Sequence, residues 1–130
     1  MNLLTARKLA VDKWRGFKRL VNDNYAGWTR VIEEVNTSCG FCNYVDDKHG
    51  LLNGSRQCGY CPAQKICQDH DGIFRAISEQ VTLLNITNSL NERAIKKRCE
   101  MLSDLFDEII DALNDIDIRV FVQRSLEDFL

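Results

Sequence analysis

The stretch CGFCNYVDDKHGLLNGSRQCGYCPAQKIC, residues 39–67, contains two motifs in which two residues separate a pair of cysteines. Cys39 and Cys42 form the first pair, Cys58 and Cys61 form the second, and fifteen residues lie between the pairs. This arrangement matches the signature of a four-cysteine zinc site, in which about 15–20 residues separate the pairs. The sequence therefore predicts that these four cysteines bind one Zn²⁺.

A tetrahedral zinc site requires four sulfurs at about 2.3 Å from the ion. Two residues between cysteines allow a tight turn to direct both thiolates the same way. Gly40 and Gly59 fit such turns, because glycine adopts a positive φ at little cost. Structural zinc binds with about 10–16 kcal/mol, more than the stability of many domains. We therefore expect residues 37–68 to form a compact loop or small hairpin, a zinc knuckle, that is unfolded without metal.

Two other interpretations of the cysteines remain open. Cys61-Pro62 is similar to the Cys-Pro that ends a ferredoxin motif, and Cys67 offers a fifth thiolate, so a 4Fe–4S cluster is the alternative to zinc. Cys67 is accordingly an alternate ligand or a thiol packed against the core. A thiol–disulfide centre is disfavoured, because such motifs follow a strand in a βαβ unit and no sheet is predicted. Cys99 is expected to be a small buried apolar residue.

Outside this stretch the apolar residues recur at three- and four-residue steps, which is typical of helices. The pattern predicts helix from residue 3 to about 36, with a break near Asn22-Asp-Asn24. It predicts a second helix over residues 70–86, with Ile73, Phe74, Ile77, Val81 and Leu84 on one face. Ser89 and Glu92 have the spacing of a capping box and indicate a further helix start.

The longest regular pattern in the chain follows that start. Two apolar series repeat every seven residues and form a heptad seam, which consists of Ile95, Leu102, Ile109 and Ile116 together with Cys99, Phe106, Leu113 and Val120. A seam of this length packs against another surface. That surface is either the first helix of the same chain or a second copy in a homodimeric coiled coil. Asn114-Asp-Ile-Asp117 is expected to interrupt the helix, and a last short helix is predicted to reach Leu130.

The 130 residues fit one domain. The predicted fold is mainly α, a three- to four-helix bundle with the Cys₄ zinc knuckle inserted between the first and second helices. The domain would comprise a basic helical arm (1–36), the zinc knuckle (37–68) and a helical part that carries the heptad seam (69–130).

Charge is distributed unevenly along the chain. The first thirty residues carry seven basic and two acidic side chains, whereas the thirty-one residues from Glu100 carry nine acidic and two basic ones. Packing of the first helix on the last would explain this asymmetry. Alternatively, the acidic residues dock on a basic protein, or the first helix binds nucleic acid through Arg7, Lys8, Lys13, Arg15, Lys18 and Arg19. The formal charge of −2, made more negative by zinc-bound thiolates, argues against a strongly basic nucleic-acid binder.

Several other classes are disfavoured. No apolar run reaches the roughly 20 residues of a membrane span, and the N-terminal residues do not resemble a signal peptide. Cysteines used for metal rather than disulfides are typical of a reducing compartment, so we expect a cytoplasmic protein. No nucleophile elbow, phosphate loop or catalytic pair of carboxylates is present, and we expect no enzymatic activity.

The first half, with Trp14, Trp28, Cys39, Cys42, Cys58, Cys61-Pro62 and Cys67, resembles small cysteine-rich proteins encoded by bacterial viruses. The resemblance implies a metal knuckle and a small accessory or regulatory role on a host factor, and it carries no activity with it. The hypothesis is a zinc-stabilised helical module that binds a protein partner. A nucleic-acid-binding regulator and an iron–sulfur protein are the alternatives.

Overall fold

The computed structural model of the chain describes residues 2–23, 27–35, 40–49, 61–68, 71–87 and 92–119. Within these ranges the chain forms helices and no strand, which confirms the prediction of a mainly α fold. The helices are α1 (Leu3–Asp23), α2 (Trp28–Glu34), α3 (Gly40–His49), α5 (Gln64–Gln68), α6 (Ile73–Thr87) and α7 (Glu92–Asn114). Ser89 of the expected capping box and residues 120–130 of the expected last helix lie outside the described residues.

Two helix boundaries follow the sequence pattern. The helical stretch predicted from residue 3 to 36 is divided into α1, which ends at Asp23, and α2, which begins at Trp28. α7 ends at Asn114, where the run Asn114-Asp-Ile-Asp117 predicted an interruption. Polar residues that bond their own backbone compete with helical hydrogen bonds, and both ends fall at such clusters.

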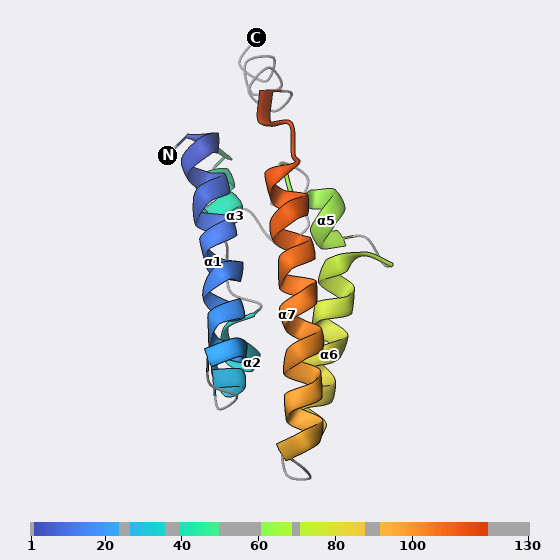
Figure 1. Cartoon of the computed structure of the whole chain (residues 1–130). Coiled ribbons are helices and arrows are strands. Elements are labelled where there is room, and N and C mark those ends of the chain that lie inside the picture. Colours follow the sequence, from blue (N-terminus) through green and yellow to red (C-terminus); the bar gives the residue numbers. More distant parts are fainter. Residues whose placement is uncertain are drawn as a thin grey trace.

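The two longest helices, α1 and α7, lie side by side and run in opposite directions (Figure 1). α1 makes its most extensive contact with α7, and α6 packs on α7 as the other arm of a helical hairpin. α3 and α2 pack on α1, α2 also reaches α6, and α5 contacts α6 and α7. The core therefore lies between a layer that contains α1 and one that contains α6 and α7.

Aromatic rings occupy the centre of this core. The Trp14 ring lies 5.7 Å from Phe17, 5.8 Å from Phe106 and 6.1 Å from Phe74, measured between centroids. These residues come from α1, α6 and α7, so one cluster joins three helices. Each aromatic ring buries about 150–250 Å², and edge contacts such as Trp14–Phe74 add further stabilisation.

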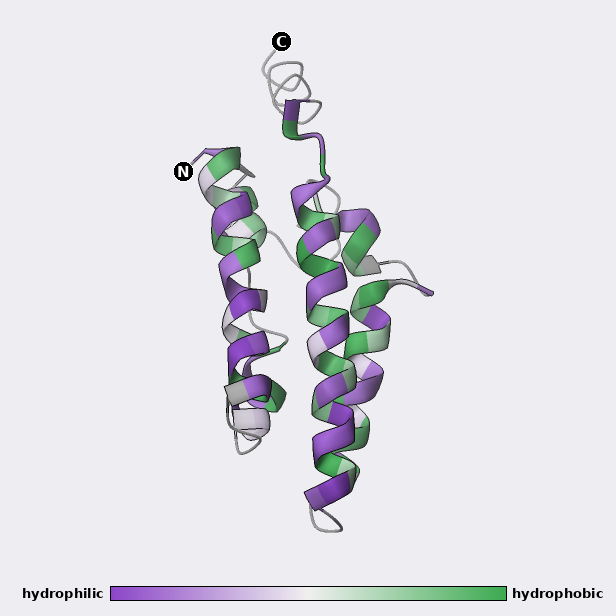
Figure 2. Cartoon of the chain, in the orientation of Figure 1, coloured by the Kyte–Doolittle hydropathy of each residue, from purple (hydrophilic) through white to green (hydrophobic). Residues whose placement is uncertain are grey.

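The heptad seam of α7 is buried inside the chain. Cys99, Leu102, Phe106, Ile109 and Leu113 are buried, and Ile95 and Ile116 pack against the same core. Figure 2 shows hydrophobic and hydrophilic residues alternating along α1, α6 and α7, as expected for helices with one buried face. The packing favours the intramolecular alternative, because a coiled-coil dimer through this seam would require α1 or α6 to leave it.

The expectation of a non-helical loop over residues 37–68 is wrong for residues 40–49 and 64–68, which form α3 and α5. Phe41, Tyr44 and Val45 are buried, and their spacing places them on one face of α3 against α1. The glycines and charged residues of this stretch obscured a short amphipathic pattern. Tertiary burial stabilises a ten-residue helix that would be marginal alone.

Gly40 has a different role from the one predicted. It is the first residue of α3, and its φ is not in the left-handed region. A Cβ at Gly40 would clash with the backbone oxygen of Ala6 and would lie 2.6 Å from Cβ of Leu9. Ala6 and Ala10 are fully buried at this crossing. Glycine is needed because the backbones of α3 and α1 approach each other so closely.

Two glycine-to-alanine substitutions provide a matched test of this packing. Gly40→Ala should destabilise the protein by about 1–3 kcal/mol, because the added methyl must displace backbone atoms of α1. Gly16→Ala, in the middle of α1 with open space around the added methyl, should stabilise it by up to about 1 kcal/mol through helix propensity. Urea unfolding followed by circular dichroism measures both. Stabilisation by Gly40→Ala would contradict the close crossing of α1 and α3.

Candidate metal centre and charged faces

Two of the four predicted zinc ligands lie in the described part of the chain. Cys42 is half-buried in the first turn of α3, and Cys61 is buried shortly before α5 begins. Cys39 and Cys58, the other member of each pair, lie outside the described residues. Among the residues that are described, no three metal-ligating side chains converge. The four-cysteine site therefore stays a prediction.

Backbone N–H groups lie near both of these cysteines. The first turn of a helix presents backbone N–H groups and the positive end of the helix dipole, and Cys42 lies in such a turn. The backbone N–H of Ala63 donates a hydrogen bond to Sγ of Cys61 at 3.4 Å. Such a bond stabilises negative charge on sulfur, and the thiolate is the form that binds a metal.

The other two cysteines contribute to packing. Cys67 lies in α5, is half-buried and packs against the hydrophobic core. Its backbone N–H donates to the carbonyl oxygen of Ala63 at 3.0 Å. Cys99 is fully buried in α7, as predicted for a small apolar residue. Burial, with a smaller contribution from the negative charge of Glu100, raises the pKa of the Cys99 thiol to about 11.

Cys99 should therefore resist alkylation in the folded protein. With a pKa near 11 instead of 9.0, its thiolate fraction at pH 8 is about a hundredfold lower, and only the thiolate attacks the reagent. Mass spectrometry of the Cys99 peptide during iodoacetamide treatment measures this rate. The same peptide in urea-unfolded protein is the control, and equal rates in the two states would contradict the burial of this side chain.

The six basic residues predicted to contact nucleic acid divide into two sets. Arg7, Lys13 and Lys18 are partly buried and contact groups of their own chain, whereas the side chains of Lys8, Arg15 and Arg19 are exposed. The three exposed cations lie seven and four residues apart, so they share one face of α1. We call this set the basic stripe.

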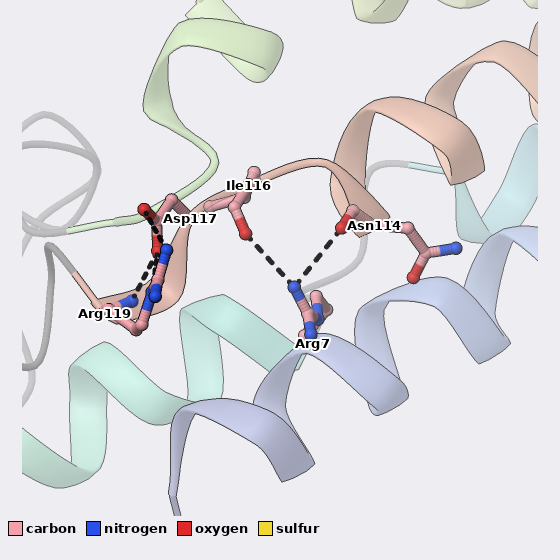
Figure 3. A network of polar contacts seen from close by, with 5 residues as sticks. All are labelled: Arg7, Asn114, Ile116, Asp117 and Arg119. Carbon is pink, nitrogen blue, oxygen red and sulfur yellow. Dashed lines mark hydrogen bonds and ion pairs between the residues drawn. The ribbon is translucent and has the colours of Figure 1, made fainter.

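Arg7 holds the C-terminal end of α7. Its Nη1 donates to the carbonyl oxygens of Asn114 at 3.3 Å and Ile116 at 3.1 Å (Figure 3). The last carbonyls of a helix have no intrahelical partner and carry partial negative charge, so a guanidinium is a suitable cap. In the same view, hydrogen bonds donated by the Arg119 side chain and backbone lower the pKa of the Asp117 carboxyl.

Lys13 serves the neighbouring helix in the same way. Its Nζ donates to the carbonyl oxygen of Val35, at the C-terminal end of α2, at 3.1 Å. The ammonium also lies 4.8 Å from the centroid of the Trp14 ring, which is within the range of a cation–π interaction. Lys13 thus joins α1 to α2 over the aromatic cluster.

The acidic residues of α7 form a second charged face. Lys18 Nζ pairs with the Asp107 carboxylate at 2.5 Å, and this ion pair joins α1 to α7 at the surface. The other carboxylates on this side are exposed and recur at three- and four-residue steps: Glu100, Asp104, Glu108 and Asp111 of α7, and Asp115, which follows the end of α7 and whose backbone N–H still donates to the carbonyl oxygen of Asp111 at 3.0 Å. With Asp107 they form the acidic ridge. Of the attraction expected between the oppositely charged first and last helices, the Lys18–Asp107 ion pair is an instance, whereas Arg7 contacts backbone carbonyl oxygens.

Replacing Arg7 should loosen the end of α7. Arg7→Met keeps much of the apolar stem but removes both hydrogen bonds to carbonyl oxygens, and we expect a loss of about 1 kcal/mol in the free energy of unfolding. Lys8→Met, at the next and exposed position, should change it by less than about 0.5 kcal/mol. Urea unfolding compares the two variants, and equal losses would contradict a capping role for Arg7.

Comparison with known proteins adds no relative. No family model matches the chain, and neither the curated proteins nor the solved structures contain a significant match. The resemblance of the first half to viral cysteine-rich proteins is therefore left as an expectation from the motif. Of the described helices, none combines the length and the apolar character needed to cross a membrane.

Proposed function

We propose that this protein is a zinc-stabilised helical binding module that acts through a protein partner. The observation that carries the proposal is the spacing of Cys39, Cys42, Cys58 and Cys61. The positions of Cys42 in the first turn of α3 and of Cys61 before α5 support it, since each sulfur lies where backbone N–H groups can interact with it. In this proposal the ion fixes the segment between α3 and α5 relative to the helical layers, and Cys67 serves as a packing residue rather than a ligand.

A protein partner suits the surface better than a small molecule does. The described helices bury their apolar faces in one core, and large apolar side chains are nevertheless left exposed on their outer sides, among them Ile86 at 67% and Leu4 at 62%. Charged faces on α1 and α7 flank the Lys18–Asp107 pair. A regulatory role, such as binding a host factor, would use surfaces of this kind and needs no catalytic group.

The nucleic-acid alternative retains one supporting observation, the exposed basic stripe of Lys8, Arg15 and Arg19. Three phosphate contacts would give a slope of about −3 in a plot of log affinity against log salt. Binding of mixed-sequence DNA with that slope, abolished by reversing the three charges, would favour this alternative over a protein partner.

Metal content tests the proposal directly. Elemental analysis of the purified chain should find one zinc per chain, and Cys58→Ser should lose it, because three thiolates hold the ion far less tightly. Removal of zinc by a chelator should lower the unfolding temperature and the helical signal, since the binding free energy of a structural zinc contributes to folding.

Matched variants separate the ligands from the other thiols. Cys67→Ser and Cys99→Ala should both retain one zinc. Iron content together with visible absorbance in anaerobically purified protein would favour the iron–sulfur alternative over zinc. A chain free of both metals would overturn the proposal. Partners captured by the zinc-loaded wild type and lost with Cys58→Ser would support the binding role.

A further inference from the structure

The acidic ridge of α7 is a costly arrangement for a lone helix. Between Arg98 and Arg119 the sequence contains no basic residue. Like charges three and four residues apart on a helix repel one another, and the ridge contains such pairs along its whole length. Within the described part of the chain, Lys18 forms an ion pair with Asp107 of this ridge. A cationic surface that covers the ridge would relieve this repulsion.

Helical spacing from Lys18 and Asp107 places the basic stripe and the acidic ridge on the outward side of the contact between α1 and α7. Lys18 and Asp107 join the two helices at that side. Arg15 and Arg19 flank Lys18 on α1, and Asp104 and Glu108 flank Asp107 on α7, so both charged faces begin at this ion pair and extend outward. The molecule therefore presents a positive row beside a negative row.

The two rows match in spacing and direction. Lys8, Arg15 and Arg19 are separated by seven and then four residues, and Asp104, Glu108 and Asp115 by four and then seven. α1 and α7 are antiparallel, because Arg7 contacts Asn114 while Lys18 contacts Asp107. At a rise of 1.5 Å per residue each row is about 16 Å long. Equal spacings in opposite directions place the charges at equal heights.

This geometry is self-complementary under a two-fold axis parallel to the helices. Such an axis places α1 of a second copy over α7 of the first, and α7 of the second over α1 of the first, with heights preserved. We propose that the chain forms a homodimer in which Lys8, Arg15 and Arg19 of one copy face Asp115, Glu108 and Asp104 of the other. The proposal goes beyond the zinc-stabilised module and does not depend on it. It leaves the buried heptad seam intact.

Light scattering coupled to size exclusion tests the proposal on the full chain. At about 10 mM salt, where the Debye length is about 30 Å, we expect twice the mass of one chain. At about 1 M salt, where it is about 3 Å, we expect a monomer. A monomer at both salt concentrations would overturn the proposal. It would do so even if that monomer binds DNA through the basic stripe.

Charge reversal identifies the surface. One triple variant makes the basic stripe acidic (Lys8→Glu, Arg15→Glu, Arg19→Glu), and a second makes the ridge basic (Asp104→Lys, Glu108→Lys, Asp115→Lys). Each variant alone should be a monomer, because α1 and α7 then carry like charges. An equal mixture should form a one-to-one heterodimer, because α1 and α7 of the two variants are again opposite in charge. A mixture of folded monomers that does not associate would overturn the proposal.

Controls exclude effects of net charge and of misfolding. A triple variant with the same charge change at exposed positions on α2, α5 and α6 should remain a dimer: Arg30→Glu, Lys65→Glu and Arg75→Glu. If a triple reversal prevents folding, the single pair Arg15→Glu and Glu108→Lys repeats the mixing test. Each single variant should weaken self-association at low salt and the mixture should restore it. Unchanged dimers in both would overturn the proposal.

Discussion

The packing of α1 on α7 is the contact on which the rest of the structure depends. Trp14 and Phe17 of α1 meet Phe106 of α7, and Phe74 brings α6 into the same aromatic cluster. An amphipathic helix of this length gains most of its stability from burying its apolar face. The remaining helices pack around this pair: α6 on α7, and α2 and α3 on α1. α3 packs on α1, and α5 packs on α6 and α7. A metal bound between α3 and α5, as proposed above, would therefore lie between elements that belong to both layers.

Some cations at the edges of this contact bind groups of the same chain, and others are exposed at the surface. Arg7 caps α7, Lys13 caps α2, and Lys18 pairs with Asp107. These cations lie where helix ends or carboxylates need positive charge, and the hydrogen bonds hold the antiparallel register. The cations at neighbouring positions, Lys8, Arg15 and Arg19, point away from the core. On α1, the cations that contact neighbouring helices are thus each followed within one or two residues by an exposed cation of the basic stripe.

The two cysteine pairs belong to the segment that connects the layers. α3 packs on α1 through Phe41, Tyr44 and Val45, and Gly40 permits the close crossing. α5 packs on α6 and α7. The first pair includes Cys42 of α3, and the second includes Cys61, which lies shortly before α5. In the proposed zinc site, an ion bound by both pairs would tie the residues next to α3 to those next to α5.

The sequence alone determined the features that depend on local periodicity. The 3.6-residue helical repeat predicted α1, α2, α6 and α7, the polar clusters predicted the ends at Asp23 and Asn114, and the heptads identified the buried face of α7. The cysteine spacing predicts a four-cysteine zinc site, which stays a prediction, and two of its members, Cys42 and Cys61, lie within the described residues. Only the tertiary structure decided what each face packs against. It made residues 40–49 a helix and gave Gly40 a steric role against Ala6. It also divided six similar cations into two helix caps, one ion-paired lysine and an exposed stripe. Those outcomes depend on contacts between residues far apart in the chain, which local periodicity does not encode.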